Sequence, residues 1–126
     1  MSVIGIGTDI VDIRRITNMA DSVQQRLAKR VLTDNEYQYY LSVKQPERYL
    51  AKRWAGKEAA AKALGTGIAK GVSFGHIEIV SLTSGQPTLE LSAEALILAK
   101  KLGANCWHIS LSDEKDYATA FVVLSS

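Results

Sequence analysis

The chain has 126 residues, a length that suits one domain, residues 1–126, around a single hydrophobic core. Hydrophobic residues make up 47% and charged residues 22%, as in ordinary globular proteins, which argues against a disordered or fibrous chain. The net charge of +2 argues against general binding of nucleic acid.

The sequence carries no visible export or membrane signal. Its first residues lack a basic flank followed by an apolar run, and no apolar stretch is long enough to cross a bilayer. The single cysteine, Cys106, cannot form an intrachain disulfide, which fits a reducing compartment. We therefore expect a cytoplasmic protein.

The N-terminal residues 3–11 predict a buried β-strand. Ile4, Ile6, Thr8 and Ile10 alternate with two glycines and Asp9, so the two sets face opposite sides of the strand. The glycine face, residues 5–9, would let another backbone or a ligand come close. Asp9 lies on that face.

Helical patterns fill the next part of the chain. Residues 12–31 predict a helix that could break near residues 20–22. Thr33 and Glu36 form a capping box that opens a second helix. The longest helix is expected to begin at Pro46, to contain many alanines, and to end at Gly65.

The second half of the chain alternates strand pairs with one helix. Residues 76–81 and 87–91 predict a hairpin, residues 93–102 a helix, and residues 106–111 and 117–124 a second strand pair. The order indicates an α+β fold with a largely antiparallel sheet packed against the long central helix.

Charged residues on the long helix are the first candidates for a site. Glu58 and Lys62 are four residues apart and share a helical face, and Arg53 and Lys57 share an adjacent one. From spacing alone, an ordinary solvated ion pair is the more common explanation. The loop that begins at Gly65-Thr66 could admit a ligand, although a plain helix end is the more common explanation of such a glycine on its own.

Asp9 is a stronger candidate because a carboxylate inside an apolar strand needs a partner. Two carboxylates with substrate phosphates and waters suit magnesium, so Asp9 and Glu58 could share this ion if the long helix crosses the first strand. Asp9 could instead cap the following helix. The sequence does not decide between these alternatives.

Other site patterns are absent or incomplete. Gly5-x-Gly7 lacks the third glycine of a dinucleotide fingerprint, no Walker loop is present, and His76 and His108 lack metal-ligand spacing. Cys106 lies in an apolar strand, which predicts an inert core thiol.

Two long segments together resemble the signature motifs of holo-acyl-carrier-protein synthases. Residues 5–11, GIGTDIV, resemble the family's G-x-D-I/V motif, and residues 53–68, RWAGKEAAAKALGTGI, resemble F/W-x-x-K-E-A-x-x-K-A-x-G-T-G. Length, motif separation and the strand Trp107-His108-Ile109-Ser110 agree over the whole chain. Gly56 departs from the family, which often has a larger residue there.

The resemblance implies a magnesium-dependent 4′-phosphopantetheinyl transferase of fatty acid biosynthesis. Such an enzyme moves the 4′-phosphopantetheine of coenzyme A to a serine of apo-acyl carrier protein and releases adenosine 3′,5′-bisphosphate. By matching position, Asp9 and Glu58 would hold magnesium and Lys62 would lie near the phosphates. The residues implied for the coenzyme A nucleotide are Arg53, Lys57, Gly65, Thr66 and His108. The family is typically a homotrimer with its sites between subunits.

Basic residues of the first predicted helix suggest where the acidic carrier docks. On a continuous helix, Arg15 and Arg26 would differ by about 20° in direction, with Lys29 and Arg30 within about 60° of Arg15. The resemblance favours docking over a merely solvated face, with Arg14, Arg15, Arg26 and Arg30 as contacts. A break in the helix would spoil this alignment.

Two other functions remain compatible with the sequence. One is a different coenzyme A or nucleotide phosphotransferase that uses the same magnesium pair. The other is a non-catalytic module that only binds acyl carrier protein. The sequence leaves open whether Glu58 or a magnesium-bound water accepts the serine proton.

Overall fold

The computed structural model describes residues 2–126. Five α-helices and five strands follow one another from β1 (Val3–Asp12) to β5 (Tyr117–Ser125) in the described residues. The other strands are β2 (Ile77–Ser81), β3 (Pro87–Leu91) and β4 (Cys106–Asp113). The helices are α1 (Ile13–Thr17), α2 (Asp21–Val31), α3 (Asp34–Tyr40), α4 (Pro46–Leu64) and α5 (Ala93–Lys101), with a short 3₁₀ turn η1 (Phe74–His76).

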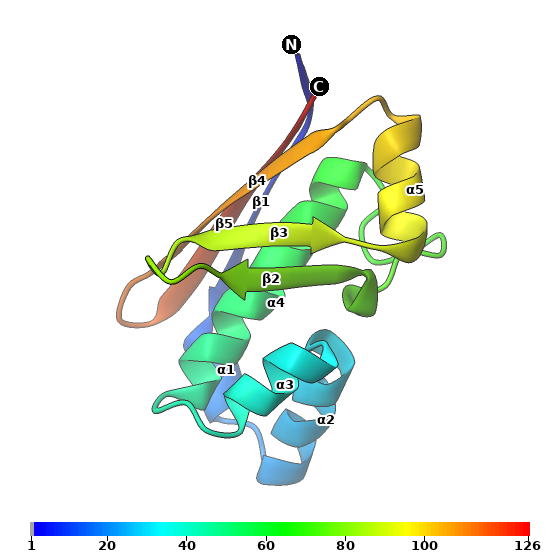
Figure 1. The fold of residues 1–126 in the computed structure, drawn as a ribbon. Helices are drawn as coiled ribbons and strands as arrows, with labels where there is room; N and C mark the ends of the chain where they lie inside the picture. Colours follow the sequence, from blue (N-terminus) through cyan, green and yellow to red (C-terminus); the bar gives the residue numbers. More distant parts are fainter. Residues whose placement is uncertain (1) are drawn as a thin grey trace.

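The strands form two antiparallel sheets, as the α+β prediction expected. One sheet has the order β1-β5-β4 and the other is the β2-β3 hairpin. Figure 1 shows α4 running between the three-stranded sheet and the hairpin, with α5 beyond the end of the hairpin. The predicted central helix is therefore confirmed, and its boundaries are the predicted Pro46 and Gly65.

Alanine allows α4 to pack closely on both sides. Seven residues of this helix that are alanine or glycine are buried. Five of them, all alanines, belong to the main hydrophobic core together with Leu50 and Leu64. The helix ends where Gly65 adopts a left-handed conformation with φ of 85°, which a side chain would disfavour.

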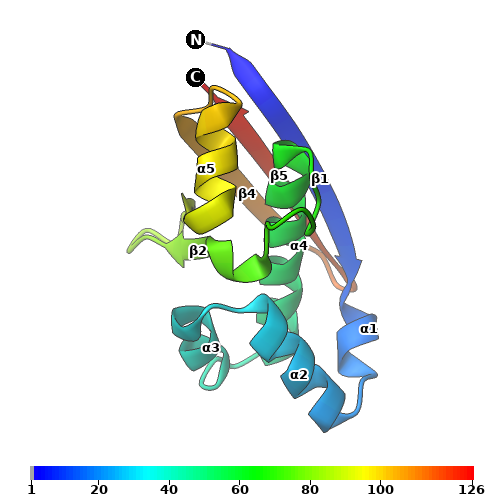
Figure 2. The same ribbon diagram turned by 90° about the vertical axis from the view of Figure 1, so that its right-hand side faces the viewer.

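The predicted helix over residues 12–31 is two helices. Asp12 caps α1 by accepting a hydrogen bond from the backbone N–H of Arg14, and α2 restarts at Asp21. Figure 2 shows α1, α2 and α3 gathered at one end of the molecule, opposite the two chain ends. At those ends, the Ser126 N–H donates to the Ser2 carbonyl at 2.8 Å.

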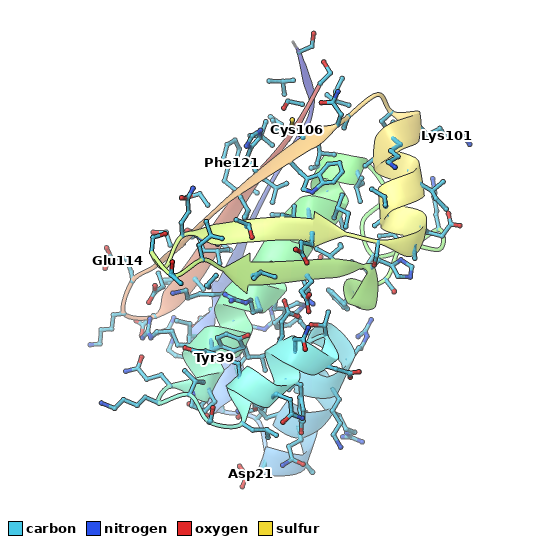
Figure 3. The ribbon with its side chains drawn as sticks, in the orientation of Figure 1. Asp21, Tyr39, Lys101, Cys106, Glu114 and Phe121 are labelled. Atoms are coloured by element: carbon cyan, nitrogen blue, oxygen red, sulfur yellow. The ribbon has the colours of Figure 1, made fainter. Side chains whose placement is uncertain are left out.

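One face of the three-stranded sheet is uncovered in the single chain. Ile6, Ile10 and Phe121 are 61%, 61% and 46% exposed, so the prediction of a fully buried first strand is wrong for its outer face. Residues of β4 alternate in the same way, with His108 outward and Ile109 inward. In Figure 3, Cys106 and Phe121 lie on this outer side, away from α4.

The prediction that Cys106 is a core thiol is also wrong. Its side chain is exposed because Trp107, the next residue, takes the inward position of the strand. An apolar run of residues does not reveal which alternate set faces the core. The chain has no helix among residues 2–126 that is long and apolar enough to span a membrane.

Candidate active site

Glycines bring strand β1 unusually close to helix α4. A Cβ atom added at Gly5 would collide with the carbonyl oxygen of Ala63, and one at Gly7 with that of Ala59. The absence of side chains on this face therefore sets the distance between strand and helix. Asp9 lies two residues further on the same face, beside α4, as the sequence predicted.

Asp9 meets a lysine of α4 at the edge of the sheet. The Lys62 ammonium donates to Asp9 Oδ1 at 2.9 Å and to the carbonyl oxygen of Thr8 at 2.9 Å. The Asp9 side chain is only 18% exposed, so this contact partly compensates a carboxylate held largely away from water. Asp12, not Asp9, caps the helix that follows, which removes the alternative role for Asp9.

Glu58 belongs to the same electrostatic cluster. Partial burial raises the pKa of the Glu58 carboxyl, and the neighbouring Asp9 carboxylate raises it further. Lys62 and Arg30 act in the opposite direction and lower the pKa. The structure thus combines two carboxylates and two cations from β1, α2 and α4, segments well separated in sequence.

The cluster fits a magnesium ion that substrate helps to hold. Residues 2–126 contain no group of three or more Asp, Glu, His or Cys side chains that could hold a metal ion alone. Asp9 and Glu58 supply two hard oxygen donors, and magnesium typically takes one or two carboxylates together with phosphate oxygens and waters. Lys62 adds a cation that can reach those same phosphates.

Arg53 lies further along α4 beside a pocket of about 300 Å³. Its guanidinium is 7% exposed, donates to Ser81 Oγ at 3.2 Å and stacks 4.6 Å from the centre of the Tyr49 ring. The Nε atom of Arg53 is buried without a hydrogen-bond partner. Tyr39 also lines this pocket, as do the carboxylates of Glu36 and Glu78, so its walls carry both signs of charge.

Lys57 does not share this site, contrary to its predicted contact with coenzyme A. Its side chain is fully buried and forms an ion pair with Glu36, which is itself 3% exposed. Burial lowers the pKa of Lys57, and the Glu36 carboxylate opposes that shift. The Lys57 ammonium has no exposed surface and three protein acceptors, so this arrangement does not support the predicted contact with coenzyme A.

The remaining predicted residues lie at the end of α4 and on strand β4. Gly65 and Thr66 follow the end of α4, and Thr66 Oγ donates locally to the Gly67 carbonyl. His108 points to the outer side of the sheet, where Ser125 Oγ lies 3.4 Å from its Nε2. It therefore cannot reach the Asp9 side of its own sheet.

The residues predicted to dock the carrier lie on α1 and α2, and the break between these helices invalidates the single continuous stripe. Arg14 already binds Asp12 at 2.8 Å and lies 3.6 Å from Asp116. Arg15 lies over the Trp54 ring at 5.4 Å. The residues on α2 are Arg26, Lys29 and Arg30.

Sequence reasoning missed two features of this region. Arg30 lies near enough to Glu58 to lower its pKa, besides stacking 5.5 Å from the Phe74 ring. The capping box disclosed Glu36 but not its ion pair with Lys57. No spacing rule links residues 21 positions apart, so only the fold could show this contact.

Comparison with known proteins shows which family has this arrangement. Residues 5–122 match the family model of the 4′-phosphopantetheinyl transferase superfamily, and the chain belongs to that superfamily. It is 54% identical over 126 residues to holo-[acyl-carrier-protein] synthase of Shewanella denitrificans, with all of both chains covered.

Solved structures agree with the sequence comparison. The crystal structure of holo-[acyl-carrier-protein] synthase from Neisseria meningitidis has a TM-score of 0.89 at 40% identity and covers 99% of this chain and 100% of its own. The Helicobacter pylori enzyme, solved in complex with coenzyme A, has a TM-score of 0.82 at 31% identity, with 95% and 99% covered. The resemblance inferred from the two motifs and the α+β fold are confirmed.

Proposed function

We propose that this chain transfers 4′-phosphopantetheine from coenzyme A to a serine of apo-acyl carrier protein. The observation that carries the proposal is the meeting of Asp9, Glu58 and Lys62 across the glycine-faced contact of β1 and α4. All three are motif positions, and a relative of this family was solved with coenzyme A. The reaction supports fatty acid biosynthesis, and its proposed location is the cytoplasm.

Each residue has a distinct proposed role. Asp9 and Glu58 would hold Mg²⁺, which would supply charge neutralisation and Lewis-acid polarisation for the phosphoryl transfer. Lys62 leaves Asp9 to contact the phosphates and stabilises the charge that develops there. Arg53, with Gly65 and Thr66, binds the nucleotide end of coenzyme A.

The bond changes follow from these positions. The serine oxygen attacks the phosphorus that carries the pantetheine, and the phosphoanhydride bond breaks to release adenosine 3′,5′-bisphosphate. Glu58, or a water beside it, accepts the serine proton.

A homotrimer with sites between subunits accounts for two otherwise unconnected features. The sheet exposes Ile6, Ile10 and Phe121, and burying each such side chain contributes about 1.5–3 kcal/mol. His108 lies on that same outer face and can serve only a neighbouring subunit's nucleotide site. Assembly through this face would bury the apolar residues and bring His108 to the nucleotide site of the neighbouring subunit.

We place the carrier on α1 and α2, next to Glu58. Arg14 is occupied by two carboxylates, so Arg15, Arg26 and Arg30 provide most of the complementary charge. Arg26→Glu should raise the KM for the carrier and leave the KM for coenzyme A within about twofold, since rim charges act mainly on association. Lys101→Glu on α5 is the matched control. Equal changes in both KM values would contradict docking on α2.

The reaction itself is tested by weighing the carrier. Incubation with coenzyme A, Mg²⁺ and apo-acyl carrier protein should add one phosphopantetheine to the carrier mass. Complex formation without a mass change would favour the binding module. Turnover of coenzyme A with no modified carrier would instead favour a different phosphotransferase.

A further inference from the structure

The buried Lys57 ammonium joins three parts of the fold that bear on the site. It donates to the carbonyl oxygen of Val31 at 2.6 Å, to that of Phe74 at 3.3 Å, and to Glu36 Oε1. An ammonium has three hydrogens, so every one has an acceptor. The acceptors belong to the end of α2, to η1 and to α3.

Glu36 ties this junction to the hairpin. Its Oε2 accepts a hydrogen bond from the backbone N–H of Ile79 at 2.8 Å, and its Oε1 accepts one from the N–H of Thr33 at 2.8 Å. Both charged side chains are therefore fully hydrogen-bonded in a site that excludes water. A buried network of this kind restricts its members to one arrangement.

The two carbonyls that accept hydrogen bonds from Lys57 belong to residues that adjoin Arg30 in sequence or contact it in space. Val31 follows Arg30 in α2, and the Phe74 ring lies under the Arg30 guanidinium at 5.5 Å. Lys57 itself precedes Glu58 in α4. One side chain thus links the backbone that carries Arg30 to the helix turn that carries Glu58.

We propose that Lys57, held by Glu36, is a positioning residue that fixes the carrier-binding end of α2 relative to Glu58. The inference rests on the proposed transfer reaction and adds a residue that sets where the carrier serine meets the site. Lys57 touches no substrate. It acts through the placement of Arg30 and Glu58.

The first test replaces Lys57 with methionine, which has a similar length but no hydrogen-bond donors. Lys57→Met should lower kcat at saturating carrier by about 10- to 100-fold, because a misplacement on the order of 1 Å can have that effect. The dissociation constant for coenzyme A, measured by calorimetry, should stay within about twofold. Measurements are made well below the thermal midpoint of each variant, so that only folded protein is compared.

A double variant separates positioning from stability. Glu36→Gln combined with Lys57→Met leaves no bare buried charge, so its thermal midpoint should recover relative to Lys57→Met. Its kcat should stay low, because methionine cannot donate to the two carbonyls. Glu36→Gln alone keeps those donors but removes the counter-ion of Lys57, so it should lower the thermal midpoint and reduce kcat less than Lys57→Met does. Recovery of kcat in the double variant, or normal kcat in Lys57→Met, would overturn the proposal.

Amide hydrogen exchange tests the link without any turnover. Residues 28–31 and 72–76 should exchange faster in Lys57→Met and in the double variant than in the wild type. The control is Leu98→Ala on α5, which trims a side chain packed against the core and should lower the thermal midpoint but spare kcat and the exchange of those two segments. If the wild type leaves the carrier unmodified, the proposed function fails. Unchanged exchange in Lys57→Met would defeat the positioning role separately.

Discussion

At the scale of single residues, the site is two carboxylates whose charges oppose each other and are moderated by cations. Asp9 is paired with Lys62 at 2.9 Å, whereas Glu58 carries a raised pKa. The two groups therefore differ in their environment before the proposed ion binds. Asp9 provides a charge that is already compensated, and Glu58 gains most from the arrival of a metal.

Isosteric amides should separate charge from shape at these positions. Asp9→Asn and Glu58→Gln each remove one anionic ligand, and the metal supplies several kcal/mol of transition-state stabilisation. Because each 1.4 kcal/mol is about tenfold in rate, transfer should fall by at least about 100-fold with the fold intact. Glu94→Gln on α5 should be silent. Near-normal turnover of either site variant at saturating Mg²⁺ would exclude the shared ion.

The pKa of Glu58 makes a second prediction with a definite sign. The folded chain without metal holds a proton at Glu58 more tightly than the unfolded chain, so its stability falls as pH rises through the raised pKa. Mg²⁺ requires the ionised carboxylate and should lower that pKa. Asp9→Asn should lower it too, because the Asp9 carboxylate raises it. NMR titration of the Glu58 carboxyl gives its pKa in the metal-free chain, in the presence of Mg²⁺ and in Asp9→Asn. A higher pKa of Glu58 in Asp9→Asn would contradict the electrostatic cluster.

At the scale of elements, the sequence predicted the parts better than their contacts. The caps at Thr33 and Gly65 marked helix ends correctly because they depend on neighbouring residues alone. The sequence predicted the strand that contains Cys106. It did not show which alternate residues of that strand face the core, because apolar side chains occur on both faces. The paired motifs identified Asp9, Glu58 and Lys62, whereas burial of Lys57 depends on α2 and η1 packing against α4.

The glycine-faced contact of β1 with α4 is the element-scale feature most sensitive to substitution. Gly7→Ala would place a methyl group against the Ala59 carbonyl oxygen and should destabilise the fold by about 3 kcal/mol, the upper range for overpacking. It should also weaken transfer by parting Asp9 from Glu58. Gly75→Ala is the control, since its added Cβ would meet Ser73 Oγ only at 4.0 Å. If Gly7→Ala and the wild type unfold at the same denaturant concentration, this account of the contact is wrong.

At the scale of the whole molecule, one chain brings the two carboxylates together but leaves His108 away from them. Asp9 and His108 lie on opposite faces of the same sheet. The outer face also carries the apolar side chains that a monomer leaves in water. In the proposed trimer, this outer face would both bury the apolar side chains and place His108 beside the site of a neighbouring subunit.

A charge on the outer sheet face should therefore dissociate the assembly. Ile10→Glu should convert a trimer into monomers in sedimentation experiments and reduce transfer strongly, because a buried unpaired carboxylate is costly. Ile97→Glu on α5 is closely matched, with 57% exposure against 61% for Ile10, and should leave the trimer unchanged. A wild-type monomer with full transfer activity would disprove active sites that require a neighbouring subunit.

The close approach of β1 to α4 has a consequence for suppressor genetics. A clash between two side chains can be relieved by a smaller residue on either partner, but the atom that Gly7→Ala would meet is the main-chain oxygen of Ala59. Every amino acid has that oxygen, and none is smaller than glycine. A selection for restored growth should therefore return glycine at position 7, with no compensating change at position 59.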